Sequence, residues 1–393
     1  MISESSSEMS GVQYSTLYFA EELMKNRLID FCILIPKSGK ISDEFRKRKI
    51  PYILSSDTSN YYSSSFSFFN DQIRIPNLLA IFLNVLKIFS DIKIFKVILK
   101  KQNPKLVITK GLFNHIAMGI SSYSLGIPVI WHLQDLITNR YFGLYRVFIS
   151  YLGKKIPNSI ICDGNLIKIA LGSKLSYKTK TILNGIKTEN FKRSQSKRTS
   201  FRKEFNIPHH SYLIGNVSRI TTWKGQYFLI QAFIKYLIRD PDSILILVGS
   251  PLFSDNKYYF ELKRIVKKHK LEKKIIFTGF RSDLDFIFSG LDFFIYSPIE
   301  KDTSPLALIS ALASGLPVSF SDIDSLKEMK KSFPNVKTFN PKNLNQIISL
   351  MKYYNDEKVR NEDGSFNLKN AENFFNISLH TSKMLKEIRS FMK

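Results

Sequence analysis

The chain has 393 residues, of which 44% are hydrophobic and 13% aromatic, and its 58 Lys and Arg against 33 Asp and Glu give a net charge of +25. This composition supplies cores for two domains of about 150 residues each and excludes a disordered or collagen-like chain. Two cysteines are too few for a disulfide scaffold or a four-cysteine zinc site. The positive charge favours phosphate-bearing or polyanionic partners, or an anionic membrane surface.

The positive charge is spread along the chain. Residues 1–187 hold 25 Lys and Arg against 12 Asp and Glu, which is about half of the total excess. A basic arm that binds nucleic acid would concentrate the positive charge in one part of the chain, so we expect no nucleic-acid partner. No run of 18 apolar residues predicts a transmembrane helix, and the first residues, MISESSSEM, do not resemble a signal peptide. The sequence predicts a cytoplasmic protein. Peripheral binding to the cytoplasmic face of a membrane is the alternative.

In the first half of the chain, apolar runs alternate with helical patterns, which is typical of a parallel α/β domain. The predicted strands are 30–36, 51–56, 105–110, 128–133, 159–164 and 179–185. The predicted helices are 14–26, 41–49, 75–101, 139–152 and 164–172. We therefore expect a doubly wound, Rossmann-like domain over residues 1–187.

The first strand of this domain is expected to be missing or truncated. Only MISESSSEMSGVQ precedes the first predicted helix, whereas a doubly wound domain places its first strand at the sheet centre. Met1, Ile2 and Ser3 read as the last residues of such a strand. We therefore expect the chain as given to be less stable than a longer form with the whole strand.

The segment 75–101 predicts a long helix that is apolar on most faces, and six lysines lie between residues 87 and 105. A basic amphipathic helix can lie on an anionic bilayer. The alternative is a core helix whose lysines face solvent.

A second alternating series follows the charged stretch 192–204. Its predicted strands are 212–218, 243–250, 274–280, 292–297 and 317–321, and its predicted helices are 224–239, 257–270, 305–314, 342–354 and 371–391. We expect a second Rossmann-like domain over residues 188–370, and a C-terminal helix within 371–393 that packs back toward the first domain. Two such domains are expected to face a central ligand cleft.

The segment GNVSRITTWKGQ (215–226) places two cations after a predicted strand. Arg219 can grip a diphosphate in a bidentate manner, and Lys224 can add a point charge. Solvated loop charges are the alternative interpretation in so basic a protein.

The segment EKDTSPLALISALASGLPV (300–318) predicts a buried helix, because its helical part is apolar except for two serines. Ser304 is expected to be the N-cap, Pro305 the first helical residue and Gly315 the stop signal. The N-terminus of such a helix offers free backbone N–H groups to a phosphate. A plain crossover helix is the alternative.

Together with TILNGIKTENF (181–191), IIFTGFRSDL (275–284) and LGIPVIWHLQD (125–135), these two segments resemble glycosyltransferase family 4 over most of the chain. The resemblance implies a two-domain GT-B fold and a retaining transferase that builds cell-envelope polysaccharide. It further implies a UDP- or GDP-linked sugar donor held mainly by the second domain. A glycan or lipid-linked acceptor on the first domain is implied too, with no metal or other cofactor.

The resemblance also assigns site residues. Arg219 and Lys224 match the basic pair that holds the donor diphosphate, where they would neutralise charge on the departing nucleoside diphosphate. His132 matches a histidine near the donor sugar, and Asp302 matches the first carboxylate of an acidic pair. The remaining positions that match donor-binding segments are Gly11, Asn184, Gly225, Arg281, Thr303, Ser304 and Ser310.

The chain departs from the family pattern at three places. Ser310 replaces the second carboxylate of the acidic pair, which would bind the ribose hydroxyls, and the expected loss of donor affinity is about tenfold. Asp324-Ser325 and Ser10-Gly11 replace two glycine pairs. A catalytically weak or silent GT-B-like protein that binds nucleotide sugars is therefore the alternative. A sugar-nucleotide epimerase or phosphorylase of similar fold would need an acid–base constellation that the sequence does not show.

Overall fold

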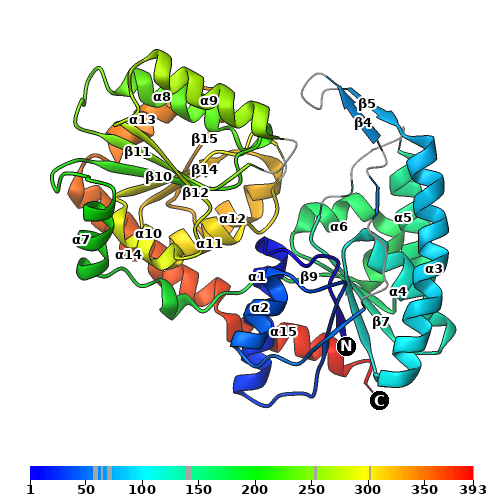
Figure 1. The fold of residues 1–393 in the computed structure, drawn as a ribbon. Helices are drawn as coiled ribbons and strands as arrows, with labels where there is room; N and C mark the ends of the chain where they lie inside the picture. The colour runs from blue at the N-terminus through cyan, green and yellow to red at the C-terminus, as the bar shows by residue number, and fades with distance from the viewer. Residues whose placement is uncertain are drawn as a thin grey trace. The chain divides into compact units, whose positions relative to one another are not determined.

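The computed structural model describes residues 1–55, 61–62, 65–68, 73–135, 137, 143–251, 255–300 and 302–392. The chain divides into two compact units, shown as ribbons in Figure 1. Unit 1 comprises Met1–Gly185 and Ile377–Lys393, and unit 2 comprises Ile186–Asn376. Each unit is Rossmann-like, with helices around a parallel sheet, as the alternating pattern predicted.

Unit 1 is built on a parallel sheet of order β3-β2-β1-β6-β7-β8-β9. Its strands are β1 (Ile2–Ser3), β2 (Ile33–Ile35), β3 (Tyr52–Leu54), β6 (Val107–Lys110), β7 (Val129–Leu133), β8 (Ser159–Cys162) and β9 (Thr179–Thr181). Every strand predicted for this part of the chain is confirmed. A separate antiparallel hairpin of β4 (Ser65–Phe68) and β5 (Ile73–Pro76) was not predicted.

The first strand is present at the centre of this sheet. Ile2 pairs with Ile33 on one side and with Ile108 on the other, both in parallel register. The part of our expectation in which this strand is missing is therefore wrong. With two residues, β1 is shorter than both of its neighbours.

The helices of unit 1 are α1 (Gly11–Lys25), α2 (Lys40–Lys47), α3 (Leu78–Gln102), α4 (Leu112–Ser124), α5 (Leu144–Lys155), α6 (Asn165–Leu171) and α15 (Ile377–Arg389). Helix α4 was not predicted, because Gly111 stands at its N-cap position where a polar cap would have marked the start. The predicted helix 139–152 starts within 138–142, which lie outside the described residues, and its described part is α5. In the described part of the chain, no helix combines the length and apolarity needed to cross a bilayer.

Unit 2 has a parallel sheet of order β12-β11-β10-β13-β14-β15. Its strands are β10 (Leu213–Val217), β11 (Ile244–Val248), β12 (Ile275–Gly279), β13 (Phe293–Tyr296), β14 (Val318–Ser321) and β15 (Lys337–Phe339). All the predicted strands are confirmed. The edge strand β15 was missed, because three residues that begin with a lysine do not stand out as an apolar run.

The helices of unit 2 are α7 (Gln195–Glu204), α8 (Gln226–Tyr236), α9 (Asn256–Lys268), α10 (Leu284–Gly290), α11 (Leu306–Ala313), α12 (Lys327–Ser332), α13 (Leu344–Tyr353) and α14 (Glu357–Phe375). The prediction of one helix over 371–391 is wrong. Its first residues belong to α14, and the extended backbone of Asn376 separates α14 from α15 of unit 1.

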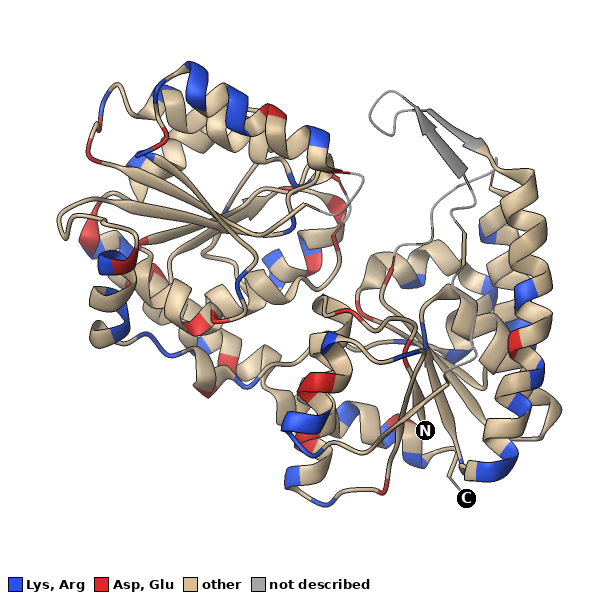
Figure 2. Cartoon of the chain, viewed as in Figure 1, with Lys and Arg blue, Asp and Glu red and all other residues tan. Residues whose placement is uncertain are grey.

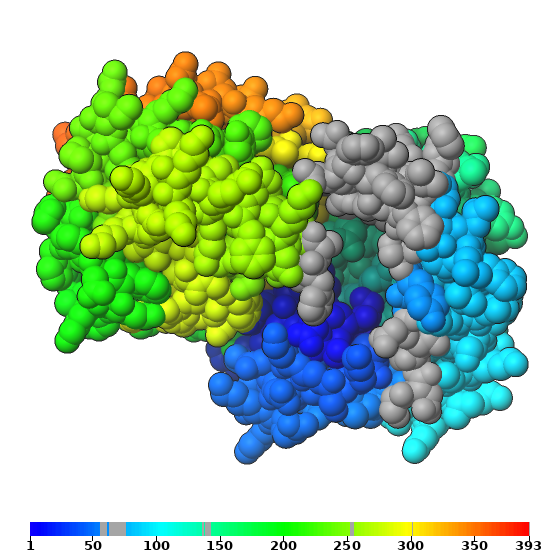
Figure 3. Space-filling model, turned by 45° about the horizontal axis from the view of Figure 1, so that its top comes forward, coloured from blue at the N-terminus to red at the C-terminus, as the bar shows by residue number. Residues whose placement is uncertain are grey.

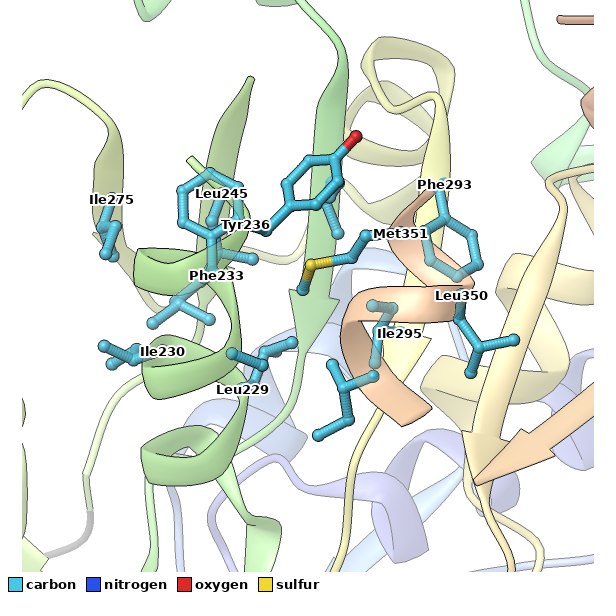
Figure 4. Close-up of a cluster of buried hydrophobic side chains, with 14 of the residues drawn as sticks. Leu229, Ile230, Phe233, Tyr236, Leu245, Ile275, Phe293, Ile295, Leu350 and Met351 are labelled. Carbon is cyan, nitrogen blue, oxygen red and sulfur yellow. The ribbon is translucent and has the colours of Figure 1, made fainter. Parts of the chain in front are cut away.

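A cluster of buried apolar side chains fixes the sheet of unit 2 between its helices (Figure 4). Leu229 and Phe233 from α8 and Met351 from α13 pack against Leu245 of β11 and Phe293 of β13. Full burial stabilises each such side chain by about 1.5–3 kcal/mol. This packing holds the strands rigidly, so the loops at their carboxyl ends are well positioned for a binding site.

Candidate functional site

A buried lysine lies at the carboxyl edge of the sheet of unit 2. Lys224 ends the short 3-10 helix η3 (Thr222–Lys224), which follows β10, and Tyr296 ends the neighbouring strand β13. The Nζ atom of Lys224 donates a hydrogen bond to the Tyr296 hydroxyl at 2.6 Å and forms an ion pair with the carboxylate of Asp302. The Tyr296 hydroxyl donates in turn to Asp302. The three side chains form a closed cluster around one positive charge.

Burial controls the electrostatics of this cluster. It lowers the pKa of the Lys224 amine, and the nearby Asp302 carboxylate opposes that effect. Burial and the same carboxylate raise the pKa of Tyr296 well above its usual value, so its hydroxyl stays protonated and can donate. A buried cation requires a paired anion, and here Asp302 is that anion.

Arg219 lies beside Lys224, as the spacing of the motif predicted. Its guanidinium carbon is 5.7 Å from the ring centroid of Trp223, and the Nζ of Lys224 is 4.4 Å from the same centroid. Arg219 is exposed, and none of the carboxylates that the structure describes forms an ion pair with it. Its bidentate donors are therefore available to an anion.

The backbone at Gly225 sets the position of Lys224. Gly225 has a φ of +71°, and a Cβ built on it would lie 2.0 Å from the carbonyl oxygen of Ser297. Only glycine fits so close an approach in a left-handed conformation. Any side chain here would push η3 away from the end of β13.

The loop before α11 contains Asp302 and Thr303. The backbone N–H of Asp302 donates to the Ser325 hydroxyl at 2.9 Å. Ser325 is one of the departures from the family pattern, and it anchors the loop that carries Asp302. Its neighbour Asp324 is largely exposed and forms an ion pair of 2.7 Å with Lys327.

Helix α11 is buried, as predicted, but it starts one residue later than expected. Pro305 is its N-cap, so the prediction that Ser304 caps the helix is wrong. Ser304 has a φ of +45°, and an N-cap residue requires an extended backbone. Gly315 follows the end of the helix with a φ of +73°, which confirms the predicted stop. Ser310 is only 1% exposed within α11, and its contact with a ribose stays a prediction.

The side chain of Arg281 forms its contacts away from the Lys224 cluster, in another part of unit 2. Its guanidinium forms ion pairs with Glu204 and Asp283, which raise the pKa of Arg281, and it stacks over the rings of Phe205 and Phe286. It therefore connects α7 to the start of α10. The structure does not bring its guanidinium into the Lys224 cluster, and the part of this segment in donor binding stays a prediction.

Unit 1 carries a buried histidine–aspartate pair at the ends of β7 and β8. The Nε2 atom of His132 lies 2.6 Å from Oδ1 of Asp163. Gln134 and Asn184 donate amide hydrogen bonds to Oδ2 of Asp163 at 2.9 and 3.0 Å. Burial alone would raise the pKa of Asp163, but His132, Gln134 and the charge of Lys110 outweigh it, and the pKa lies below its usual value. Asp163 therefore remains ionised.

A second cluster of polar side chains lies at the ends of β1 and β6 of unit 1. The Nζ of Lys110 donates to the Thr16 hydroxyl at 2.6 Å and lies 3.8 Å from Oε1 of Glu4. Gln13 donates to Oε2 of Glu4 at 3.1 Å. Gly11, the exposed first residue of α1, has no atom within 4 Å of a Cβ built on it. A side chain at this position would therefore meet open space, and the contact of Gly11 with the donor stays a prediction.

Sequence reasoning missed Asp163, Lys110, Glu4 and Tyr296. Each stands at or directly after the last residue of a strand, and at the carboxyl edge of a parallel sheet such positions point into the binding region. That signal was present in the sequence. Within the described ranges, no three His, Cys, Asp or Glu side chains group as metal ligands would.

Comparison with known proteins shows which family this chain is similar to. Residues 197–362 match the family model of the glycosyl transferases, group 1. A UDP-Gal:alpha-D-GlcNAc-diphosphoundecaprenol alpha-1,3-galactosyltransferase of Escherichia coli is 23% identical over 368 residues, which cover 90% of this chain and 87% of the relative. The O-antigen biosynthesis glycosyltransferase WclY of Escherichia coli is 29% identical over 178 residues, which cover 45% of this chain and 46% of the relative.

Solved structures show the same fold. The HepE protein of Anabaena, in complex with UDP and glucose, has a TM-score of 0.81 at 18% identity, with 99% of this chain and 98% of that chain covered. WaaG, a glycosyltransferase of lipopolysaccharide biosynthesis, has a TM-score of 0.67 at 12% identity, with 98% of each chain covered. The chain thus has the GT-B fold, and the family model and the relatives support a glycosyltransferase of the family 4 type.

Proposed function

We propose that this glycosyltransferase moves a sugar from a nucleoside-diphosphate donor to a lipid-linked or glycan acceptor of the cell envelope, with retention of anomeric configuration. The observation that carries the proposal is the pair of cations, Arg219 and Lys224, over one indole at the carboxyl edge of the unit 2 sheet. Ligands of open α/β sheets bind at that edge. UDP is the favoured nucleotide, because HepE is described with UDP and the Escherichia coli relative is named for UDP-Gal.

The two cations have different tasks in this proposal. Arg219 is exposed and can bind two phosphate oxygens at once, whereas Lys224 is buried and acts as a point charge. Both stabilise the negative charge that grows on the nucleoside diphosphate as the glycosidic bond breaks. We propose that they supply this stabilisation without a metal ion. Asp302 and Tyr296 keep the Lys224 amine in place.

The proposal is tested by transfer from UDP- and GDP-sugars to a diphosphoundecaprenol-linked sugar. We expect an α-linked product from an α-linked UDP-sugar, identified by the anomeric coupling in proton NMR, and an unchanged rate after addition of EDTA. A β-linked product would contradict retention. UDP binding without transfer or donor hydrolysis would instead favour the alternative, a silent nucleotide-sugar binding protein.

We also propose that unit 1 contacts an anionic membrane through α3. One face of this helix carries large apolar side chains that are each at least half exposed, and these are Leu78, Leu79, Phe82, Leu86 and Phe89. Lysines follow along the same helix, as the blue positions of Figure 2 show, and α3 lies at the surface in Figure 3. Apolar side chains that enter the headgroup region, with lysines at the lipid phosphates, are typical of interfacial helices.

Vesicle flotation tests the membrane contact. We expect the protein to float with phosphatidylglycerol vesicles and to remain unbound with phosphatidylcholine, because the lysines need anionic headgroups. Leu79→Ser combined with Phe82→Ser should abolish flotation. Ile238→Ser, which removes an exposed apolar side chain from unit 2, is the matched control and should float as the wild type does. Equal flotation of all variants would contradict the assignment to α3.

A further inference from the structure

A groove lined by polar side chains runs along the edge strand β15 of unit 2, between this strand and α13. Its larger part has a volume of about 680 Å³, within the range of about 300–1,000 Å³ that is usual for ligand sites. A second part of about 410 Å³ lies at the N-terminal end of α13. Asn343 and Asn345 line both parts, so the two parts form one groove that is open to solvent.

Helix α13 presents a polar face to this groove. Gln346, Ser349 and Tyr353 follow one another at intervals of three and four residues, which places them on one side of the helix, and all three line the groove. Ile347 and Met351 lie on another side and pack into the core of the unit. The 10 residues of α13 extend about 15 Å. The groove is therefore long enough for an extended chain molecule.

Three lysines in the groove have no counterion. Lys337 lines its larger part, and Lys235 and Lys342 line the other part. None of the carboxylates that the structure describes forms an ion pair with these amines. The Nζ of Lys337 lies 4.3 Å from the ring centroid of Tyr353, which holds this charge at the groove wall. Residues 329–354 contain five lysines and no Asp or Glu, so the groove attracts anions.

Two amide side chains in the groove are fixed with their N–H groups free. Oε1 of Gln346 accepts a hydrogen bond from the backbone N–H of Asn340 at 2.7 Å, and Oδ1 of Asn343 accepts one from the backbone N–H of Gln346 at 3.2 Å. Within the described ranges, the amide nitrogens of Gln346 and Asn343 have no acceptor. Amines and amide N–H groups are donors. The groove therefore suits a ligand that is rich in acceptor oxygens.

We propose that this groove binds an acidic oligosaccharide, which is a chain of sugars that carry carboxylate or phosphate groups. The anionic groups pair with the lysines, and the hydroxyl and ring oxygens accept hydrogen bonds from the two amides. The inference goes beyond the proposed function, because the side chains of the Lys224 cluster do not line the groove and its occupation requires no sugar transfer.

Other anionic partners fit this groove less well. Single-stranded nucleic acid stacks its bases on aromatic rings, and here Tyr353 supplies the ring while Lys337 already lies over it. An anionic membrane needs large apolar side chains that protrude, whereas Leu350 in the larger part is buried. A bound protein helix would need an apolar groove. The donor-rich lining therefore favours a sugar chain.

Isothermal titration of the whole protein at low salt tests the ligand class. The probe is tetragalacturonate, a sugar chain with one carboxylate on each ring, and we expect it to bind with an affinity that falls as salt is raised. Neither maltotetraose, a neutral chain of the same length, nor inorganic phosphate at equal concentration should displace it. Displacement by maltotetraose would show that charge is not recognised, and displacement by phosphate that the sugar chain is not. Either result, or no binding of tetragalacturonate, would overturn the proposal.

Lys337→Gln combined with Lys342→Gln tests the location of the site. Lys342 is exposed and Lys337 is half-buried, so this variant should fold as the wild type does. We expect its affinity for tetragalacturonate to fall about fivefold to tenfold, because each exposed ion pair contributes little, with UDP affinity unchanged. Lys267→Gln combined with Lys268→Gln removes the same charge from exposed positions on α9 and should bind as the wild type does. Unchanged affinity in the groove variant, or equal weakening by both pairs, would overturn the assignment to this groove.

Discussion

Arg219→Ala is expected to weaken UDP binding about tenfold to a hundredfold without loss of stability. A charge-assisted hydrogen bond contributes about 1.5–3 kcal/mol, and about 1.4 kcal/mol corresponds to a tenfold change in affinity. The guanidinium of Arg219 is exposed and contacts only the ring of Trp223 among the groups described above. The free energy of unfolding should therefore stay within about 0.5 kcal/mol of the wild type. Isothermal titration with UDP and urea unfolding measure the two quantities.

Arg264→Ala is the matched control for this experiment. Arg264 is exposed on α9 of the same unit, so its removal takes away the same charge at a different place. We expect this variant to bind UDP as the wild type does. Equal weakening by both substitutions would mean that net charge attracts the nucleotide, and Arg219 would then have no specific role.

Lys224→Met is expected to destabilise unit 2 by about 3 kcal/mol and also to weaken UDP binding. The substitution keeps most of the apolar volume and leaves the carboxylate of Asp302 without its cation. Removal of one partner from a buried ion pair typically costs about 3–5 kcal/mol, and we take the lower end because the side chain of Asp302 is 15% exposed. The midpoint of urea unfolding and UDP titration give both values.

A double variant separates the two roles of Lys224. Lys224→Met combined with Asp302→Asn removes the uncompensated charge, so part of the lost stability should return, while UDP affinity should stay low because the cation is still missing. Lys235→Met, an exposed position on the neighbouring helix α8, should resemble the wild type. If the double variant is no more stable than Lys224→Met alone, Asp302 is not the counterion that the geometry indicates.

The order of strands and helices was predictable because parallel strands buried on both faces read as continuous apolar runs. The runs at 212–218 and 243–250 became β10 and β11 within one or two residues. Elements with a weaker signal were missed. Helix α4 begins without a polar cap, and β15 is a three-residue edge strand.

The sequence by itself determined the resemblance to glycosyltransferase family 4, the alternation of elements and the basic pair of Arg219 and Lys224, because these depend on residues close together in the chain. Only the tertiary structure decided what each charge contacts. Tyr296 is 72 residues from Lys224, and Asp163 is 31 residues from His132. Parallel strands bring such distant residues to one edge of a sheet. Whether a buried side chain there stays charged depends on the partner that the fold places beside it.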